Sequence, residues 1–205
     1  MLRRQFASCL SGLVGLWLAS SAFAAPVVGQ PAPDFSLTDT AGKLVRLSDF
    51  RGKHVVLEWT NPGCPFVRKH YGAGNMQALQ REAAAKGVVW LAANSTEPNS
   101  GDYLKPHAAC RLDDRAKAAP SATLMDEAGG VGQSYGARTT PHMYIVSPQG
   151  TLLYAGAIDS IPSSRVDDIK TATNYVRQSL TEALASKPIS TPVTKPYGCS
   201  VKYKA

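Results

Sequence analysis

One cysteine, Cys64, lies between a predicted strand and a predicted helix, and this junction constrains the fold more than any other feature of the chain. The preceding run from Val55 to Leu57 is continuously apolar, which is typical of a short strand covered on both faces. We therefore expect a central, parallel strand at residues 54–60. The sequence Asn-Pro-Gly at residues 61–63 predicts a turn, and Pro65 suits the first position of a helix. Cys64 is thus expected at a helix N-terminus.

Local patterns on both sides of this junction predict the remaining elements. Two alternating segments, residues 34–38 and 43–47, are separated by a Thr-Ala-Gly turn and predict an N-terminal β-hairpin. After Cys64, a helix interrupted by Gly72 and Gly74 and capped again by Asn75 leads into a buried strand at residues 88–92, which makes a unit of a parallel sheet. Further elements are expected at residues 108–116 (a helix in a long connection), 122–125, 142–146 and 151–155 (strands), 131–135 (a helical turn) and 171–185 (the last helix, with an apolar stripe of Tyr175, Val176, Leu180, Ala183 and Leu184).

The first 24 residues have the pattern of an export signal. Arg3 and Arg4 precede an apolar run at residues 10–18 that is too short for a membrane span, and Ala22 and Ala24 are small residues at the positions that a signal peptidase needs. We expect cleavage after Ala24 and a periplasmic or secreted protein with no integral membrane segment after cleavage. An uncleaved N-terminal anchor is the alternative.

Cleavage would leave 181 residues, enough for one domain with its own core. We expect an irregular lead-in at residues 25–33, a three-layer α/β domain with a central sheet at residues 34–186, and a Pro-rich tail at residues 187–205. The signal holds two of the 22 basic residues and none of the 15 acidic ones, so the net charge becomes +5. Because the basic residues are scattered, nucleic acid and anionic membranes are not favoured as partners.

Three cysteines remain after cleavage, and in an oxidising compartment an odd number indicates one pair and one free or reactive thiol. A thiol acts as a nucleophile in its thiolate form, and a helix N-terminus or nearby basic groups lower its pKa. Cys64 has the helix start, Arg68 one turn later, and Lys69 and His70 close by. We therefore expect Cys64 to be reactive and not an inert core cysteine. The other two thiols are those of Cys110 and Cys199.

Two segments resemble the thioredoxin superfamily: NPGCPFVRKHY, which contains Cys64, and YGARTTPHMYIVSPQG, which contains Pro141. Residues 34–184 as a whole are similar to its peroxiredoxin-like branch (AhpC/TSA, or redoxin), and the tail sequence YGCSVKY is similar to one found in secreted redoxin proteins. The resemblance implies a thioredoxin-like three-layer fold with a central mixed sheet and the hairpin as an N-terminal extension. It also implies that Pro141 is a cis-proline that holds Thr140 against Cys64; an ordinary trans turn proline is the alternative.

The chain departs from the family's pattern around the cysteine. Thioredoxin-type reductases carry a second cysteine three residues after the first, where this chain has Val67. Peroxiredoxins carry a threonine three residues before the peroxidatic cysteine, where this chain has Asn61. The peroxiredoxin arginine that steadies the thiolate has no direct counterpart, because Pro141 occupies its neighbourhood; Arg68 and Arg138 are the candidates to replace it. Any resolving thiol must therefore come from elsewhere in the chain.

Cys199 is our first candidate for that resolving thiol. It lies in a tail that we expect to be flexible and long enough, at about 3.3 Å per extended residue, to span the domain. A structural bridge between Cys199 and Cys110 is the alternative, so the sequence leaves the partner of Cys64 open between Cys199 and Cys110.

The function expected from the resemblance is that of an exported thiol-dependent oxidoreductase with antioxidant activity. Peroxiredoxin-like reduction of peroxides comes first, and thiol–disulfide exchange on protein disulfides is the alternative; either needs a peroxide or disulfide substrate and a thiol electron-donor protein. We expect no cofactor and no metal. Copper binding through Cys64, His70, His142 and Met143, or a non-enzymatic binding role, is the alternative of another class. The candidate catalytic residues are Cys64, Cys199, Pro141, Arg68 and Thr140.

Overall fold

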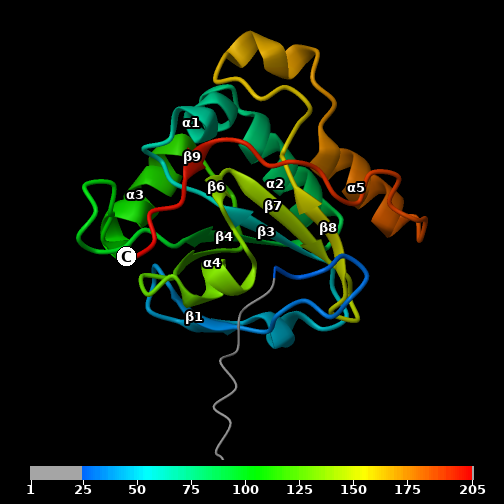
Figure 1. Ribbon diagram of the computed structural model, residues 1–205, viewed down its shortest axis with the longest axis horizontal. Coiled ribbons are helices and arrows are strands. Elements are labelled where there is room, and N and C mark those ends of the chain that lie inside the picture. Colours follow the sequence, from blue (N-terminus) through cyan, green and yellow to red (C-terminus); the bar gives the residue numbers. More distant parts are fainter. Residues whose placement is uncertain (1–24, 205) are drawn as a thin grey trace, which may run out of the picture.

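A central mixed sheet of seven strands carries the fold, in the order β2-β1-β5-β4-β3-β7-β8 (Figure 1). The structure, a computed structural model, describes residues 25–204, so the expected export signal lies outside the described residues. At the centre, β3 (Val55–Trp59) pairs in parallel with β4 (Val89–Asn94) and antiparallel with β7 (His142–Val146). The buried parallel strand expected before Cys64 is confirmed.

The two edges of the sheet come from hairpins. The predicted N-terminal hairpin forms from β1 (Ser36–Asp39) and β2 (Leu44–Arg46), and β1 joins the sheet through β5 (Ala122–Met125). At the other edge, β8 (Leu152–Gly156) pairs antiparallel with β7. The hairpin is therefore an extension of the central mixed sheet, as the resemblance implies.

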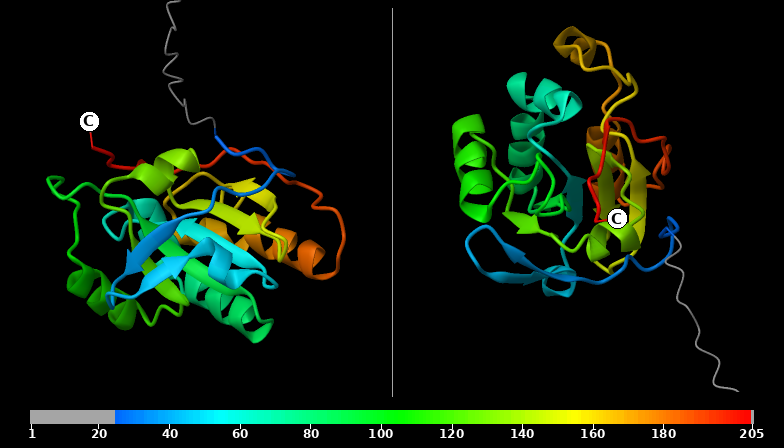
Figure 2. Two further views of the ribbon diagram at one scale, coloured as in Figure 1. Left: turned by 90° about the horizontal axis from the view of Figure 1, so that it is seen from below. Right: turned by 60° about the vertical axis from the view of Figure 1, so that its left-hand side comes forward.

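Helices cover both faces of the sheet and make three layers (Figure 2). On one face, side chains of α2 (Asn75–Ala85) and α5 (Tyr175–Leu184) pack against alternate strand residues such as Val56 and Trp90. α1 (Pro65–Gly72) contacts α2, and α3 (Pro106–Ala116) contacts β5. On the other face, the lead-in, the 3-10 turn η1 (Leu47–Phe50) and α4 (Gly130–Ser134) lie over the opposite strand residues. Among residues 25–204, no helix has the length and apolar character that crossing a membrane requires.

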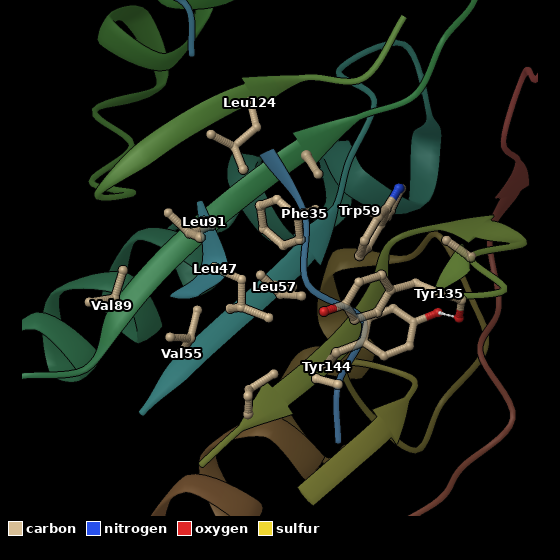
Figure 3. Close-up of a cluster of buried hydrophobic side chains, with 14 of the residues drawn as sticks. Phe35, Leu47, Val55, Leu57, Trp59, Val89, Leu91, Leu124, Tyr135 and Tyr144 are labelled. Carbon is tan, nitrogen blue, oxygen red and sulfur yellow. Dashed lines mark hydrogen bonds between the residues drawn. The ribbon is translucent and has the colours of Figure 1, made fainter. Parts of the chain in front are cut away.

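The larger core cluster is drawn in Figure 3. The rings of Trp59, Tyr135 and Tyr144 pack together with centroids 5.2–5.3 Å apart, and two of the three pairs meet edge-on. Aliphatic side chains complete the cluster. Successive residues of β3 and β4 belong in turn to this cluster and to the cluster on the other face of the sheet. This is the two-residue period of a strand that is covered on both faces. The aliphatic members labelled in the figure are Leu47, Val55, Leu57, Val89, Leu91 and Leu124.

Two helix ends differ from the sequence prediction. The last helix begins at Tyr175 and not near residue 171, because the side chain of Asn174 accepts a hydrogen bond from the Arg177 N–H and caps it there, after a separate 3-10 turn, η2 (Val166–Lys170). Asn75 does not cap α2: Gly74 holds that position. At the end of the apolar stripe, Leu184 is exposed.

The Pro-rich tail differs most from its prediction, because it lies against the domain and is not a free segment. It runs back from α5 to β9 (Cys199–Ser200), which pairs antiparallel with β6 (Thr139–Thr140) (Figure 1). On the way, the Thr194 hydroxyl accepts a hydrogen bond from the Ala157 N–H (2.8 Å). Gly156 permits this approach, because a Cβ there would lie 2.1 Å from the Thr194 hydroxyl oxygen.

We predict that the core cluster tolerates truncation poorly. Replacing Leu124, which is fully buried, with alanine should lower the free energy of unfolding by about 2–5 kcal/mol. The matched control is Leu44→Ala on the exposed hairpin strand, where 48% of the side chain is accessible and the expected change is within about 0.5 kcal/mol. Urea denaturation of both variants checks this, and equal losses would contradict the assignment of the core.

Candidate active site

Cys64 is the N-cap residue of α1, at the end of the turn that follows β3. Asn61 builds that turn: its side-chain oxygen accepts the Gly63 N–H (2.7 Å) and its backbone carbonyl accepts the Cys64 N–H (3.0 Å). The Asn61 amide also donates to the Thr96 hydroxyl (3.1 Å). The side chain at the place of the peroxiredoxin threonine therefore shapes the loop that presents the cysteine. Cys64 itself is only 3% exposed.

The loop opposite Cys64 is that of Thr140 and Pro141. The Thr140–Pro141 peptide bond is cis, as the resemblance implies. The Cys64 thiol donates a hydrogen bond to the Thr140 carbonyl oxygen at 3.0 Å. Among residues 25–204, the buried Thr140 hydroxyl has no partner within ordinary hydrogen-bond geometry, and its weaker contact with Cys64 favours the thiolate form. Two of the residues predicted for the site thus meet at Cys64.

Cys199 lies at the same place, from a third direction. In the β6–β9 pair, Cys199 is the register partner of Thr140, and Ser200 that of Thr139. Gly198 lets the strands approach, because a Cβ there would lie 2.0 Å from the Thr140 carbonyl oxygen. The structure thus brings Cys199, and not Cys110, to Cys64. Cys110 is exposed on α3, and all three thiols are free.

The two neighbouring thiols differ in acidity. Burial would raise the pKa of Cys64, but hydrogen bonds from the Cys199 side chain, from backbone N–H groups of Val67 and Cys199 and from the Thr140 side chain outweigh it, so the pKa lies below its usual value. The Val67 N–H belongs to the first turn of α1, where backbone donors are unpaired. Burial and the adjacent Cys64 raise the pKa of Cys199 to about 11. Cys64 is therefore the more acidic of the two thiols and Cys199 the less acidic one.

Basic side chains contribute less to this asymmetry than the sequence predicts. Arg68 is exposed on α1 and is not among the groups that lower the pKa of Cys64. Lys69 is buried and paired with Asp159 (3.3 Å). Burial lowers the pKa of His70 to about 4, so this side chain is neutral near pH 7. Arg68, Lys69 and His70 are thus not among the groups that lower the pKa of Cys64, contrary to the expectation. Lys69 is paired with Asp159, and His70 is uncharged.

A mainly apolar cavity of about 250 Å³ lies beside the cysteine turn. Its walls come from α1, α3 and the ends of the central strands, and Arg68 is one of the few charged groups on them. A cavity of this kind accommodates an apolar side chain more readily than a small polar molecule. Its lining residues nearest to Cys64 in the sequence are Pro62 and Val67.

One buried acid near this site was not singled out by the sequence analysis. Glu58 on β3 accepts hydrogen bonds from the Trp90 indole (2.8 Å) and the Tyr71 hydroxyl (3.0 Å). Burial raises its pKa to about 7, and these hydrogen bonds offset part of the rise. The sequence does contain a sign of this site, because Glu58 is a carboxylate inside an otherwise apolar strand. Such a residue is seldom buried unless a partner group binds it.

The histidines weighed as copper ligands are engaged by the protein. The His70 ring lies 2.8 Å from the Asn75 amide, and the His142 ring stacks on Tyr144 with centroids 4.5 Å apart. Burial lowers the pKa of His142 to about 3. Within residues 25–204, no group of three or more His, Cys, Asp or Glu side chains gathers that could hold a metal ion.

Comparisons with known proteins identify relatives of this chain. The family model described as AhpC/TSA matches residues 28–155. The thiol-disulfide oxidoreductase ResA of Bacillus cereus is 28% identical over 149 residues, which cover 70% of this chain and 79% of that protein. The thioredoxin-like protein YneN of Bacillus subtilis is 30% identical over 124 residues, covering 60% and 68% of the two chains.

Solved structures share the architecture. A hypothetical protein from Sinorhizobium meliloti matches with a TM-score of 0.77 at 23% identity, covering 89% of this chain and 97% of that one, and supports the fold alone. A protein from Chlorobium tepidum, provisionally assigned as the thiol:disulfide interchange protein DsbE, matches with a TM-score of 0.58 at 25% identity, covering 77% and 98%. The thioredoxin-like fold implied by the resemblance is confirmed.

We predict that the acidity of Cys64 depends on Cys199 and not on Arg68. In a Cys110→Ser background, the alkylation rate of Cys64 against pH should have its midpoint below the free value of about 8.5, and Cys199→Ala should raise that midpoint because a donor to the thiolate is lost. Arg68→Ala is the control and should leave it in place. If Arg68→Ala raises the midpoint and Cys199→Ala does not, this account is contradicted.

A second prediction concerns Glu58 and stability. The unfolded chain ionises Glu58 near pH 4.5, while the folded protein keeps it protonated up to about pH 7. The free energy of unfolding should therefore fall as pH rises through this window, by an amount on the order of 3 kcal/mol. Glu58→Gln should remove this pH dependence. Urea denaturation of both proteins at pH 5 and pH 8 checks it, and parallel pH dependences would show that Glu58 titrates normally.

Proposed function

We propose that this chain, which belongs to the AhpC/TSA family, catalyses thiol–disulfide exchange on protein disulfides. In this proposal Cys64 is the nucleophile and Cys199 is the resolving thiol. The chain is a thiol-dependent oxidoreductase. The observation that carries the proposal is the meeting of two thiols of unequal acidity at the backbone of Thr140. Relatives named thiol-disulfide oxidoreductase and thiol:disulfide interchange protein support exchange over peroxide reduction.

The first step uses the acidity of Cys64. Its thiolate attacks one sulfur of a substrate disulfide, so a Cys64–substrate disulfide forms while the substrate S–S bond breaks. The second substrate sulfur leaves as a thiolate and takes a proton from solvent. The Thr140–Pro141 loop lies against Cys64, so this pair is a candidate for orienting the incoming disulfide.

The second step uses Cys199. Two of the causes that raise its pKa, the hydrogen bond to Cys64 and the charge on Cys64, are lost once Cys64 is in a disulfide. Cys199 then loses its proton more readily, attacks the Cys64 sulfur and releases the substrate as a dithiol. The protein is left with a Cys64–Cys199 disulfide, which a dithiol donor protein reduces by the reverse exchange. Cys199, which is distant in the sequence, thus takes the resolving role. In thioredoxin-type reductases that role belongs to the cysteine at the position where this chain has Val67.

Peroxide reduction is the second candidate, favoured by the AhpC/TSA match. The thiolate of Cys64 would be oxidised to a sulfenic acid, which Cys199 would condense with to give the same disulfide and water. Less support comes from the site: Asn61 is engaged in the turn, and no arginine is among the groups that stabilise the thiolate. We place either activity outside the cytoplasm, because residues 1–24 have the pattern of an export signal.

The proposal predicts how single cysteine variants behave with insulin as the disulfide substrate. Cys64→Ser should lose turnover by about 100-fold or more, because the nucleophile is gone. Cys199→Ser should still attack but accumulate a Cys64–substrate disulfide, visible by mass spectrometry. Cys110→Ser is the matched control and should keep full turnover.

The competing activity is measured on the same proteins. If stoichiometric hydrogen peroxide oxidises Cys64 far faster than free cysteine while insulin is not reduced, peroxide reduction is the function and the exchange proposal is wrong. If peptide mapping of the oxidised protein finds Cys64 joined to Cys110, or in no disulfide, Cys199 is not the resolving thiol.

A further inference from the structure

A cluster of three polar side chains, two buried and one half-buried, joins α1 to the C-terminal tail. Lys69 on α1 donates to an Asp159 carboxylate oxygen (3.3 Å), and Tyr197 in the tail donates its hydroxyl to the other oxygen. The side chains of Lys69 and Asp159 are 0% and 3% exposed. We call Lys69, Asp159 and Tyr197 the tail anchor.

The hydrogen bonding of the tail anchor is completed by its surroundings. The Lys69 ammonium also donates to the Ile161 carbonyl (3.3 Å), and the Ile161 N–H donates to Asp159 (3.1 Å). The Tyr197 ring meets the Phe66 ring edge-on, with centroids 5.8 Å apart, and the Lys69 ammonium lies 5.7 Å from the Tyr197 ring centroid. Each group therefore has a defined position, and a tyrosine at position 197 is held by both its ring and its hydroxyl.

The anchor lies close in sequence to both thiols. Lys69 belongs to the helix that begins at Cys64, and Tyr197 is two residues before Cys199, so the two tail Cα atoms are at most about 7 Å apart. Beyond Cys199, the tail is held by a bond from the Val201 N–H to the Arg138 carbonyl (3.1 Å). Cys199 therefore lies between two fixed points of the tail.

A buried ion pair is a weak source of net stability, because desolvation of the charges offsets their attraction, but it specifies position when its partners are all satisfied. A hydrophobic contact has no directional partner atom, so it would not fix the register of the tail. A slip of one residue in β9 would direct Cys199 away from Cys64, since successive side chains of a strand face opposite sides.

We propose that the tail anchor is a positioning device that keeps Cys199 at Cys64 and so sets the rate of the resolving step. The proposal rests on the function proposed above. In that step Cys199, as thiolate, forms a bond to the Cys64 sulfur, the bond from Cys64 to the substrate breaks, and the substrate sulfur leaves and is protonated. The step is intramolecular, so its rate depends on the effective concentration of Cys199 at Cys64. Loosening Tyr197 lowers that concentration while both thiols stay in the chain.

The test replaces Tyr197 with phenylalanine in a Cys110→Ser parent, which keeps the ring and removes the hydroxyl donated to Asp159. The probe is one equivalent of the aromatic disulfide 5,5′-dithiobis(2-nitrobenzoate): attack by Cys64 releases one coloured thiolate, and attack of Cys199 on the resulting mixed disulfide releases the second. At a pH above the Cys64 midpoint of both proteins, we expect the second phase to slow about tenfold while the first is unchanged or faster, because the loosened tail exposes Cys64. The matched control, Tyr175→Phe, removes a hydroxyl that makes no hydrogen bond within residues 25–204 and should change neither phase.

The equilibrium provides a second readout. A tenfold loss of effective concentration should make the Cys64–Cys199 disulfide easier to reduce, with a potential less negative by about 30 mV in glutathione buffers. An unchanged second phase and potential, or equal slowing of both phases with a lowered melting temperature, would overturn the positioning role. These results are distinct from failure of the proposed function: a Cys110→Ser parent that releases only one thiolate would overturn both proposals.

Discussion

The backbone of Thr140 is the point on which the rest of the site depends. Its carbonyl accepts the Cys64 thiol, and its strand pairs with Cys199. The sheet places it there: β3 and β7 are antiparallel neighbours, with Trp59 opposite His142, so the turn after β3 and the cis-proline loop before β7 end at the same edge. Because the two hydrophobic clusters bury both faces of these central strands, a shift in this register would expose core side chains.

The acidity of Cys64 arises from backbone and thiol donors and not from surface charge. A charge on a long exposed side chain such as Arg68 is screened by water, whereas the N–H of Val67 and the groups of Cys199 act at hydrogen-bond distance in a buried place. The same contacts leave Cys199 protonated. The division of roles between the two thiols is therefore a property of their shared contact, and changes when one of them is in a disulfide.

Buried ionisable groups on the face of the sheet that carries α1 are paired with groups of other elements. Glu58 is held by Trp90 and Tyr71, and Lys69 by Asp159, in a region where unpaired charge is costly. The partner groups come from separate elements, so each pair fixes one element against another. The tail adds only partly buried apolar side chains to the core, those of Tyr197 and Val201, so polar contacts also contribute to its position.

The sequence by itself determined the elements and the superfamily. An apolar run followed by Asn-Pro-Gly, Cys64 and Pro65 encodes strand, turn and helix within a dozen residues, and the alternating hairpin segments do the same, because these signals arise from contacts between near neighbours. Only the tertiary structure decided which thiol meets Cys64, where Lys69 and His70 are directed, and that the tail is bound. Those outcomes depend on contacts between residues 64 and 140, 69 and 159, and 140 and 199. Contacts between residues so far apart in the sequence leave no local pattern that could be used to predict them. They form only once the strand order of the sheet has brought the distant segments to one edge.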